Sequence, residues 1–426
     1  MRNLIENNDY KVFIENDKKY IYMSDTGKIY GTDEEIEKVL EDESLFLDVT
    51  EKRKKISQKK IEEMTVGSIS LLVIQGCNLR CTYCYGEDGQ YQDSGIMDKD
   101  TALKSIEFFV NQSPLEDINI CFFGGEPLMN FSVIREVVNY CHEIEKNGRK
   151  KIRFSMTTNG TLINEEIEEF ILENKIAVQI SLDGDKKTQD KNRFDASRCG
   201  TYDRVIENTK SLREKGALGV RATLTPFNMN VKEIYRHLDS LNFNKIIISP
   251  AFNLMADEDY DVLAEKYIEW YRDLESELKK GNYQFVRKAK LFKQEIQRID
   301  RALVRTMSCG VGKNLVAVDI HGNVFPCQRF VSMKDYCIGS INEGLHGQRS
   351  FLKSVNAMEN DKCKECWIRN LCVAGCPFCN AADNGDIHKK NEICCEYEKK
   401  VYEELIRIYL RLSEDEKKLL LDVRTM

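Results

Sequence analysis

The strongest constraint on the fold is a regular alternation of short apolar runs and amphipathic segments between residues 68 and 250. Apolar runs of strand length lie at residues 69–75, 117–123, 151–157, 177–182, 220–224 and 245–249. Segments with helical apolar spacing lie between them, at residues 98–111, 131–147, 164–174, 202–215 and 231–241. Alternating strands and helices predict parallel strands joined by right-handed crossovers. An open barrel and a doubly wound sheet both fit this order of elements.

Three cysteines follow the first apolar run at once. Cys77, Cys81 and Cys84 form a C-x3-C-x2-C loop, and Tyr83 precedes the last of them. Iron–sulfur clusters are normally held by four thiolates, so three on one loop leave one iron open to a substrate or cosubstrate. The C-x2-C part alone, Cys81 and Cys84, would favour a zinc site. The full loop, directly after a strand, favours a catalytic cluster.

The next strands also end in polar or glycine-rich sequence. Gly124-Gly125-Glu126-Pro127 follows the second apolar run, where two glycines permit a close backbone approach and Glu126 offers an acceptor for an ammonium group. Thr158-Asn159-Gly160 closes the third run, and Ser181-Leu182-Asp183-Gly184 closes the fourth. Because active sites of parallel barrels lie at the carboxyl ends of their strands, these residues are candidates for one site.

The remaining cysteines lie mostly after two predicted helices, at 257–280 and 285–304. Besides Cys337 and Cys379, they include Cys309, Cys327, Cys363, Cys366, Cys372, Cys376 and the pair Cys394-Cys395, with Gly322 between the first two of these. Four thiolates on one loop, as in residues 363–376, also fit zinc. With five histidines against sixteen cysteines, metal binding in this chain rests on thiolate.

The cysteine loop and the GGEP element together resemble the signature of the radical S-adenosylmethionine (radical SAM) superfamily. The resemblance implies a partial (β/α)6 TIM-like barrel in which Cys77, Cys81 and Cys84 hold a catalytic [4Fe–4S] cluster. It implies that Glu126 binds the amino group of S-adenosylmethionine and that Arg193 pairs with its carboxylate. The implied cosubstrate residues are Tyr83, Gly124, Gly125, Glu126, Pro127, Thr158, Asn159, Ser181, Asp183 and Arg193. Among the residues after the third and fourth strands, Ser181 and Arg193 are the stronger candidates. Asp183 is also suited to hold its own loop.

The C-terminal cysteine pattern resembles SPASM domains, which bind two auxiliary [4Fe–4S] clusters. By this resemblance, auxiliary cluster I takes Cys309, Cys327 and Cys376, and auxiliary cluster II takes Cys363, Cys366, Cys372 and either Cys394 or Cys395. The pattern supplies only three ligands for cluster I. Either one of its irons is open and can bind a cysteine of the substrate, or Cys337 or Cys379 completes the set.

The first sixty residues form a separate unit in this interpretation. Predicted strands at 10–14, 19–23 and 28–30, with a turn at Asp25-Thr26-Gly27, precede a predicted helix at 33–40 and a charged run at 51–60. This order resembles the winged-helix element with which peptide maturases capture a leader peptide by strand addition. A plain cap on the barrel is the alternative. The expected division is 1–62 leader recognition, 63–255 barrel, 256–305 helical bridge and 306–426 SPASM domain.

Composition excludes several other classes of protein. A net charge of −7 offers no basic field for nucleic acid, and no apolar run reaches the ~20 residues of a membrane span. The N-terminal residues lack the apolar core of a signal peptide, so sixteen cysteines indicate metal binding in a cytoplasmic protein rather than disulfides.

The expected activity follows from the resemblance. It is the installation of thioether links in a ribosomally made precursor peptide, as in sactipeptide and ranthipeptide maturases, using S-adenosylmethionine, three [4Fe–4S] clusters and a flavodoxin- or ferredoxin-type electron donor. The alternatives are a carbon–carbon crosslinking or epimerising peptide maturase, a sulfatase-type maturase, and a non-catalytic electron carrier.

Overall fold

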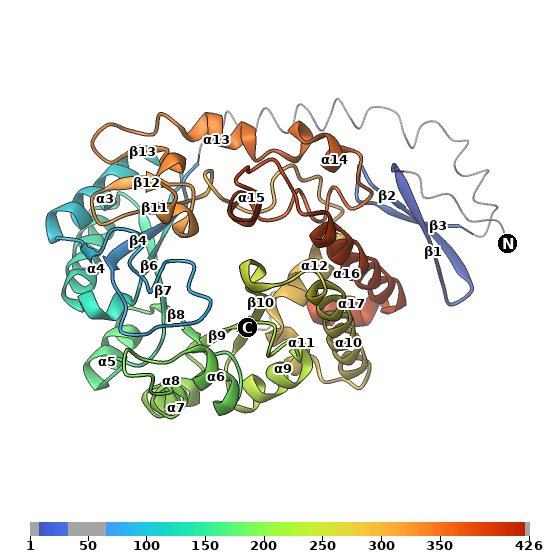
Figure 1. Cartoon of the computed structure of the whole chain (residues 1–426), viewed down its shortest axis with the longest axis horizontal. Coiled ribbons are helices and arrows are strands. Elements are labelled where there is room, and N and C mark those ends of the chain that lie inside the picture. Colours follow the sequence, from blue (N-terminus) through green and yellow to red (C-terminus); the bar gives the residue numbers. More distant parts are fainter. Residues whose placement is uncertain (1–7, 33–64, 422–426) are drawn as a thin grey trace.

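The computed structural model describes residues 8–32 and 65–421. Its main sheet contains six parallel strands in the order β10-β9-β8-β7-β6-β4. They are β4 (Ser68–Gln75), β6 (Asp117–Gly124), β7 (Lys151–Thr158), β8 (Ala177–Ser181), β9 (Leu218–Leu224) and β10 (Lys245–Pro250). Each lies within two residues of its predicted position. The strands follow an arc, and the helices between them lie on its outer side (Figure 1).

The helices of this unit are α3 (Lys99–Gln112), α4 (Phe131–Lys146), α5 (Glu165–Glu173), α6 (Lys186–Asn192), α7 (Tyr202–Asn208), α8 (Lys210–Glu214) and α9 (Val231–Ser240). Asn164 caps α5 by accepting the Ile167 N–H at 2.9 Å. The single helix predicted over 202–215 is wrong, because the chain divides at the buried Thr209, whose hydroxyl donates to the Val205 carbonyl. The polar helix α6 was missed because it has no apolar stripe.

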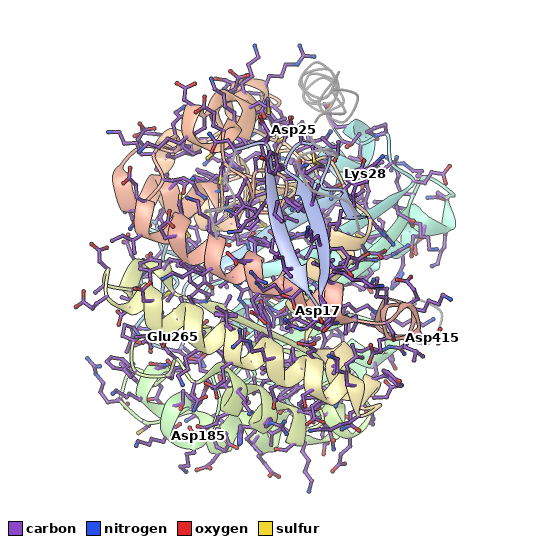
Figure 2. The ribbon with its side chains drawn as sticks, turned by 90° about the vertical axis from the view of Figure 1, so that its right-hand side faces the viewer. Asp17, Asp25, Lys28, Asp185, Glu265 and Asp415 are labelled. Carbon is purple, nitrogen blue, oxygen red and sulfur yellow. The ribbon has the colours of Figure 1, made fainter. Side chains whose placement is uncertain are left out.

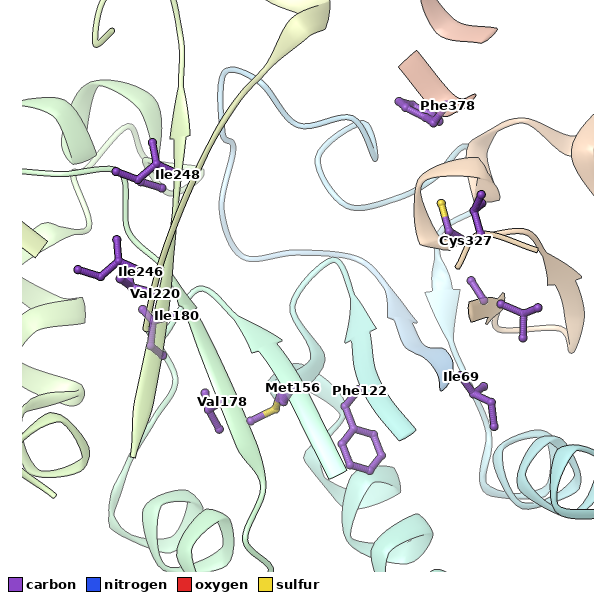
Figure 3. Packing of buried hydrophobic residues seen from close by; sticks show 14 of the residues in the cluster. Ile69, Phe122, Met156, Val178, Ile180, Val220, Ile246, Ile248, Cys327 and Phe378 are labelled. Carbon is purple, nitrogen blue, oxygen red and sulfur yellow. The ribbon is translucent and has the colours of Figure 1, made fainter. Parts of the chain in front are cut away.

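The core lies between this sheet and its helices. Strands β6 and β7 alternate buried with more exposed residues, whereas all of β4 after Ser68 is buried because it lies at the centre of the sheet. Phe122 and Phe154 stack at a centroid distance of 6.1 Å, and Ile180, Val220 and Ile248 continue the packed layer (Figure 3).

The helical bridge consists of α10 (Asp259–Lys279), α11 (Tyr283–Lys288) and α12 (Lys290–Asp300). The second helix predicted there, over 285–304, is wrong as a single element. It divides at the buried Ala289, whose backbone forms a bridge with Ile246 of β10. This pairing takes the chain out of helical geometry for one residue.

The cysteine-rich part continues the main sheet. Strand β11 (Leu315–Val318) pairs parallel with β4, and β12 (Asn323–Phe325) and β13 (Gly339–Ser340) follow as antiparallel strands. Short β5 (Gly95–Ile96) pairs with β4. The C-terminal helices are α13 (Gln348–Ser354), α14 (Asp361–Lys364), α15 (Pro377–Asn384), α16 (Glu392–Arg411) and α17 (Glu414–Leu421). No helix in the described residues is long and apolar enough to cross a membrane.

The N-terminal strands form a sheet of their own. The three predicted strands are present as β1 (Tyr10–Glu15), β2 (Lys18–Met23) and β3 (Ile29–Thr32), and they pair antiparallel. The predicted helix at 33–40 and the charged run at 51–60 lie outside the described residues. Figure 2 shows the hairpin on the molecular surface, running between the turns at Asp25 and Asp17.

This sheet docks on the cysteine-rich part through Trp367 and Arg369. The rings of Phe13 and Tyr22 meet Trp367 edge-on at 6.4 and 6.1 Å. Arg369, only 4% exposed, donates to Asp25 at 2.7 Å and to Asp9 at 3.2 Å. A buried, permanently charged guanidinium requires these carboxylates, so the contact is specific as well as apolar.

Arg369→Met should therefore release the N-terminal sheet. Loss of a buried cation whose partners can reach water is expected to cost about 2 kcal/mol of unfolding free energy. Urea denaturation followed by tryptophan fluorescence measures this, since Trp367 lies under the sheet. Lys146→Met, which removes an exposed ion pair with Glu143, is the control and should change little. Equal stability of the Arg369 variant and the wild type would contradict the docking argument.

Candidate functional site

The loop of Cys77, Cys81 and Cys84 is held between two neighbouring segments at the end of β4. On one side, the N–H groups of Gly125 and Glu126 donate to the Ile74 and Gly76 carbonyls at 3.0 Å each. On the other side, the N–H groups of Arg80 and Thr82 donate to the Phe194 and Asn192 carbonyls at 2.7 and 3.0 Å. The loop is therefore fixed by backbone bonds to the end of β6 and to the segment after α6.

The two glycines at the end of β6 permit this close packing, and their role in the approach of a ligand stays a prediction. A Cβ on Gly125 would lie 2.0 Å from the Gly76 carbonyl oxygen, and one on Gly124 would lie 2.2 Å from that of Ile74. Gly124 also has φ +141°, which L side chains rarely adopt. Glycine is required at both positions because two backbones touch.

Glu126 is fully buried beside this loop. Its carboxylate accepts from the Thr158 hydroxyl at 2.6 Å, the Asn159 N–H at 2.7 Å and the Leu128 N–H at 3.1 Å. Burial nevertheless raises the pKa of Glu126 above its ordinary value. A carboxylate has about four acceptor positions, so this one can still accept an ammonium group. Thr158 and Asn159 thus orient Glu126, and Pro127 begins the short helix η2 (Pro127–Asn130) behind it.

Tyr83, Asp183 and Arg193 form a second buried network. The Tyr83 hydroxyl donates to Asp183 at 2.7 Å and accepts from the Arg193 guanidinium at 2.7 Å. Asp183 also accepts the Thr223 N–H at 2.9 Å, so it holds its loop, as expected. The Arg193 Nε is buried and has no hydrogen-bond partner within the described residues. This orphaned donor fits a carboxylate ligand, and Ser181 lies nearby at the end of β8, opposite Arg221.

Burial disfavours the ionised form of two thiols of the loop, those of Cys77 and Cys81. Burial raises the pKa of Cys77 to about 12 and that of Cys81 to about 11, while Arg193 opposes the shift at Cys81. Iron binding must displace these protons. No three His, Cys, Asp or Glu side chains of residues 8–32 and 65–421 converge as they would around a single metal ion. The three thiols of such a loop would each bind a different iron of a [4Fe–4S] cube, so they lie farther apart than the ligands of a single metal ion.

A second set contains Cys309, Cys327 and Cys376. Burial raises the pKa of Cys327 to about 12, with the charges of Cys376 and Cys309 adding to the effect. Cys379 joins this set, since the Arg329 Nη1 atom lies 3.4 Å from its sulfur and 3.6 Å from that of Cys376. The Cys337 thiol donates instead to the Gly339 carbonyl at 3.2 Å.

A third set surrounds a cavity of about 990 Å³. Cys363, Cys366, Cys372 and Cys395 line this cavity, whereas Cys394 is not among its lining residues. Lys390 also lines it, with Nζ 3.1 Å from the Cys372 sulfur. Four thiols and a cation around one space suit a [4Fe–4S] cluster, and they favour Cys395 over Cys394 as the fourth ligand.

The first and second sets are linked by aromatic contacts. Tyr85, directly after Cys84, meets the ring of Phe378 at 6.0 Å. The Arg329 guanidinium lies 5.2 Å from the centroid of Tyr85 and 4.3 Å from that of Phe378. The loop of Cys77, Cys81 and Cys84 and helix α15 are therefore in contact.

Sequence reasoning missed Arg329 and Lys390, the cations beside the second and third cysteine sets. Their signal in the sequence is weak: Arg329 follows Cys327 by two residues, and Lys390 lies in the run His388-Lys389-Lys390-Asn391. Neither position could be distinguished from surface charge without the fold.

Gly125→Ala should disrupt the cysteine loop, because the added methyl group would overlap the Gly76 carbonyl. We expect a loss of about 3 kcal/mol or more in unfolding free energy, the upper range for overpacking. Gly31→Ala is the control, since its Cβ would meet ordinary contacts at 3.5 Å on Tyr20. Thermal denaturation measures both, and a stable Gly125 variant would mean that the loop does not pack as described.

Residues 71–241 match the family model of the Radical SAM superfamily. A cysteine-type anaerobic sulfatase-maturating enzyme of Clostridium novyi is 27% identical over 376 residues, 80% of this chain and 96% of that protein. The radical SAM cyclopropyl synthase TigE of Paramaledivibacter caminithermalis is 23% identical, covering 83% of this chain and 75% of that protein.

Two solved structures share the fold. Native anSMEcpe with bound AdoMet and Cp18Cys peptide has a TM-score of 0.68 at 22% identity, covering 81% of this chain and 100% of that one. Streptococcus suis SuiB bound to precursor peptide SuiA has a TM-score of 0.54 at 14% identity, covering 91% and 98%. Residues 71–241 are therefore a radical SAM domain, and the chain is an enzyme of the radical SAM superfamily, related to sulfatase-maturating enzymes and peptide maturases.

Proposed function

We propose that this radical SAM maturase installs thioether links between cysteine sulfur and carbon in a ribosomally made precursor peptide. The observation that carries the proposal is the N-terminal sheet, docked on the cysteine-rich part ahead of the radical SAM domain and presenting a strand edge. The division at 1–62, 63–255, 256–305 and 306–426 into leader-recognition element, partial (β/α)6 barrel, bridge and SPASM domain belongs to the same proposal.

The edge strand β3 suits the capture of a leader peptide. The Met23 N–H donates to the Lys28 carbonyl, so in the antiparallel ladder Ile21 and Tyr30 form the next hydrogen-bonded pair. Ile29 and Gly31 then direct their backbone N–H and C=O groups away from β2. Among the described strands, β3 ends this sheet, so these groups can pair with an added strand.

The coverage of the related structures supports a peptide substrate with a leader. The SuiB structure with its precursor peptide aligns with 91% of this chain, whereas the anSMEcpe structure is matched over its whole length and leaves about a fifth of this chain unmatched. The unmatched part of this chain can contain an element that the anSMEcpe structure lacks. We propose that the N-terminal sheet is this element.

The catalytic residues are proposed as follows. Cys77, Cys81 and Cys84 hold the cluster whose reaction with S-adenosylmethionine supplies a 5′-deoxyadenosyl radical for hydrogen abstraction from a substrate carbon. Glu126 accepts the ammonium group of the cosubstrate, and the free Nε–H of Arg193 donates to its carboxylate. Auxiliary clusters at the second and third cysteine sets complete the proposal, with a flavodoxin- or ferredoxin-type protein as electron donor.

Sulfatase-type maturation is the second candidate, and one finding favours it. The cysteine-type sulfatase-maturating enzyme of Clostridium novyi aligns over 80% of this chain. Such a reaction would oxidise one residue without joining two. The two candidates therefore differ in their products rather than in the shared catalytic site.

Glu126→Gln tests the cosubstrate site. Loss of a charge-assisted bond worth about 1.5–3 kcal/mol should weaken S-adenosylmethionine binding roughly tenfold or more, with iron content unchanged. Thr158→Val is the matched control, because it removes one hydrogen bond from the same carboxylate but keeps its charge. Isothermal titration with reconstituted protein measures both affinities. Wild-type affinity in the Glu126 variant would refute the assignment.

Product analysis tests the reaction. The reduced enzyme, S-adenosylmethionine and the cysteine-rich peptide encoded beside its gene should yield 5′-deoxyadenosine and a product lighter by two hydrogens per link. Alkylation should detect one free thiol fewer for each link. A product with all thiols free would refute the thioether, and oxidation of a single residue in a sulfatase-derived peptide would support the second candidate instead.

A further inference from the structure

Cys379 has no role in the three-ligand pattern for auxiliary cluster I, yet it lies at the centre of that site. Helix α15 begins at Pro377 with Cys376 as its N-cap, so Cys379 stands in the first turn. Residues 376 and 379 form a C-x2-C pair, a spacing that ligands of one iron–sulfur cluster commonly use. Phe378, between them, and Cys327 lie in the same region above the end of the sheet (Figure 3).

Arg329 shows that the two sulfurs face one space. Its Nη1 atom lies 3.4 Å from the Cys379 sulfur and 3.6 Å from the Cys376 sulfur. The Arg329 Nε is buried and has no partner within the described residues. Asp383, an acidic side chain within electrostatic reach, is exposed and so balances this buried charge only weakly. A buried permanent cation requires negative charge beside it, which two metal-bound thiolates provide and two neutral thiols do not.

The rest of the site fits a four-ligand set. Cys309 and Cys327 lie within electrostatic reach of each other and of Cys376. Cys337, the other candidate, directs its thiol to the Gly339 carbonyl. We propose that Cys379 is the fourth thiolate of auxiliary cluster I, so that Cys309, Cys327, Cys376 and Cys379 close the cluster and Arg329 balances its charge. This assignment rests on the auxiliary clusters of the proposed function.

A closed cluster I changes how the substrate can react. On binding iron, the Cys379 thiol releases its proton to solvent, and no iron of this cluster remains for a substrate thiol. The sulfur of the precursor peptide must then meet the carbon radical without coordination to cluster I. Hydrogen bonds from Arg329 to two ligand sulfurs would raise the reduction potential of the cluster, which suits an electron acceptor.

The test uses the full chain with Cys77, Cys81 and Cys84 replaced by Ala, so that only auxiliary clusters remain. Cys379→Ala and Cys337→Ala are each added to this background, reconstituted anaerobically, and treated with ferricyanide and a chelator. An iron without a thiolate leaves under such treatment and produces a paramagnetic three-iron cluster. We expect the electron paramagnetic resonance signal of this three-iron cluster from the Cys379 variant alone, with an intensity of close to one such cluster per chain. Added 2-mercaptoethanol should protect that variant by supplying the missing thiolate.

Other outcomes of this experiment also decide whether auxiliary cluster I has a fourth thiolate and which cysteine supplies it. A three-iron signal from the background itself would overturn the proposal and restore the open iron, and a signal from the Cys337 variant would assign the fourth ligand to Cys337. If Cys379→Ala loses the whole cluster, Cys379→Ser distinguishes ligation from folding: retention of the cluster with an altered spectrum supports the proposal, and an unaltered spectrum overturns it. Iron for only one cluster in the background would refute the two auxiliary clusters, a separate failure of the proposed function.

Discussion

The direct contact between two stretches of backbone at the end of the sheet determines the rest of the site. Gly125 can donate to Ile74, and Glu126 to Gly76, only because no side chain separates β6 from the cysteine loop. This contact fixes where the three thiols lie relative to the buried Glu126. The end of the neighbouring strand β7 then contributes Thr158 and Asn159 to that carboxylate. One steric requirement, the absence of Cβ atoms at two positions, thus sets the geometry of a network drawn from three strands.

Each of the three cysteine sets has its own buried or half-buried cation. The charge of Arg193 acts on Cys81, Arg329 contacts Cys376 and Cys379, and Lys390 contacts Cys372. Burial disfavours ionised thiols, as the raised pKa values of Cys77 and Cys327 show. A nearby cation offsets part of that cost and so makes thiolate ligation possible in an apolar surrounding.

The sequence allowed the six parallel strands and helices α3, α4, α5, α9 and α10 to be predicted, because each depends on local periodicity, whereas no helix was predicted in the cysteine-rich part, where α13 to α17 lie. It did not allow the breaks at Thr209 and Ala289, since these depend on a hydroxyl bond and on pairing with a distant strand. The contact between Arg329 and Cys379 could not be predicted from the sequence either. They are fifty residues apart in sequence and meet only because α15 packs beside the chain after β12. A spacing motif identifies residues that are close in sequence, whereas these two residues are brought together only by the fold.

The docking of the N-terminal sheet has a consequence for the order in which the chain can fold. Asp25 finds its partner Arg369 at a separation of 344 residues. Strands β1, β2 and β3 must therefore wait until Arg369 has been synthesised before they reach their native position. Contacts at such separation form late and slowly, because a long loop must close first. Since Arg369 lies between Cys366 and Cys372, docking of the N-terminal sheet reports that the segment between these two cysteines has folded.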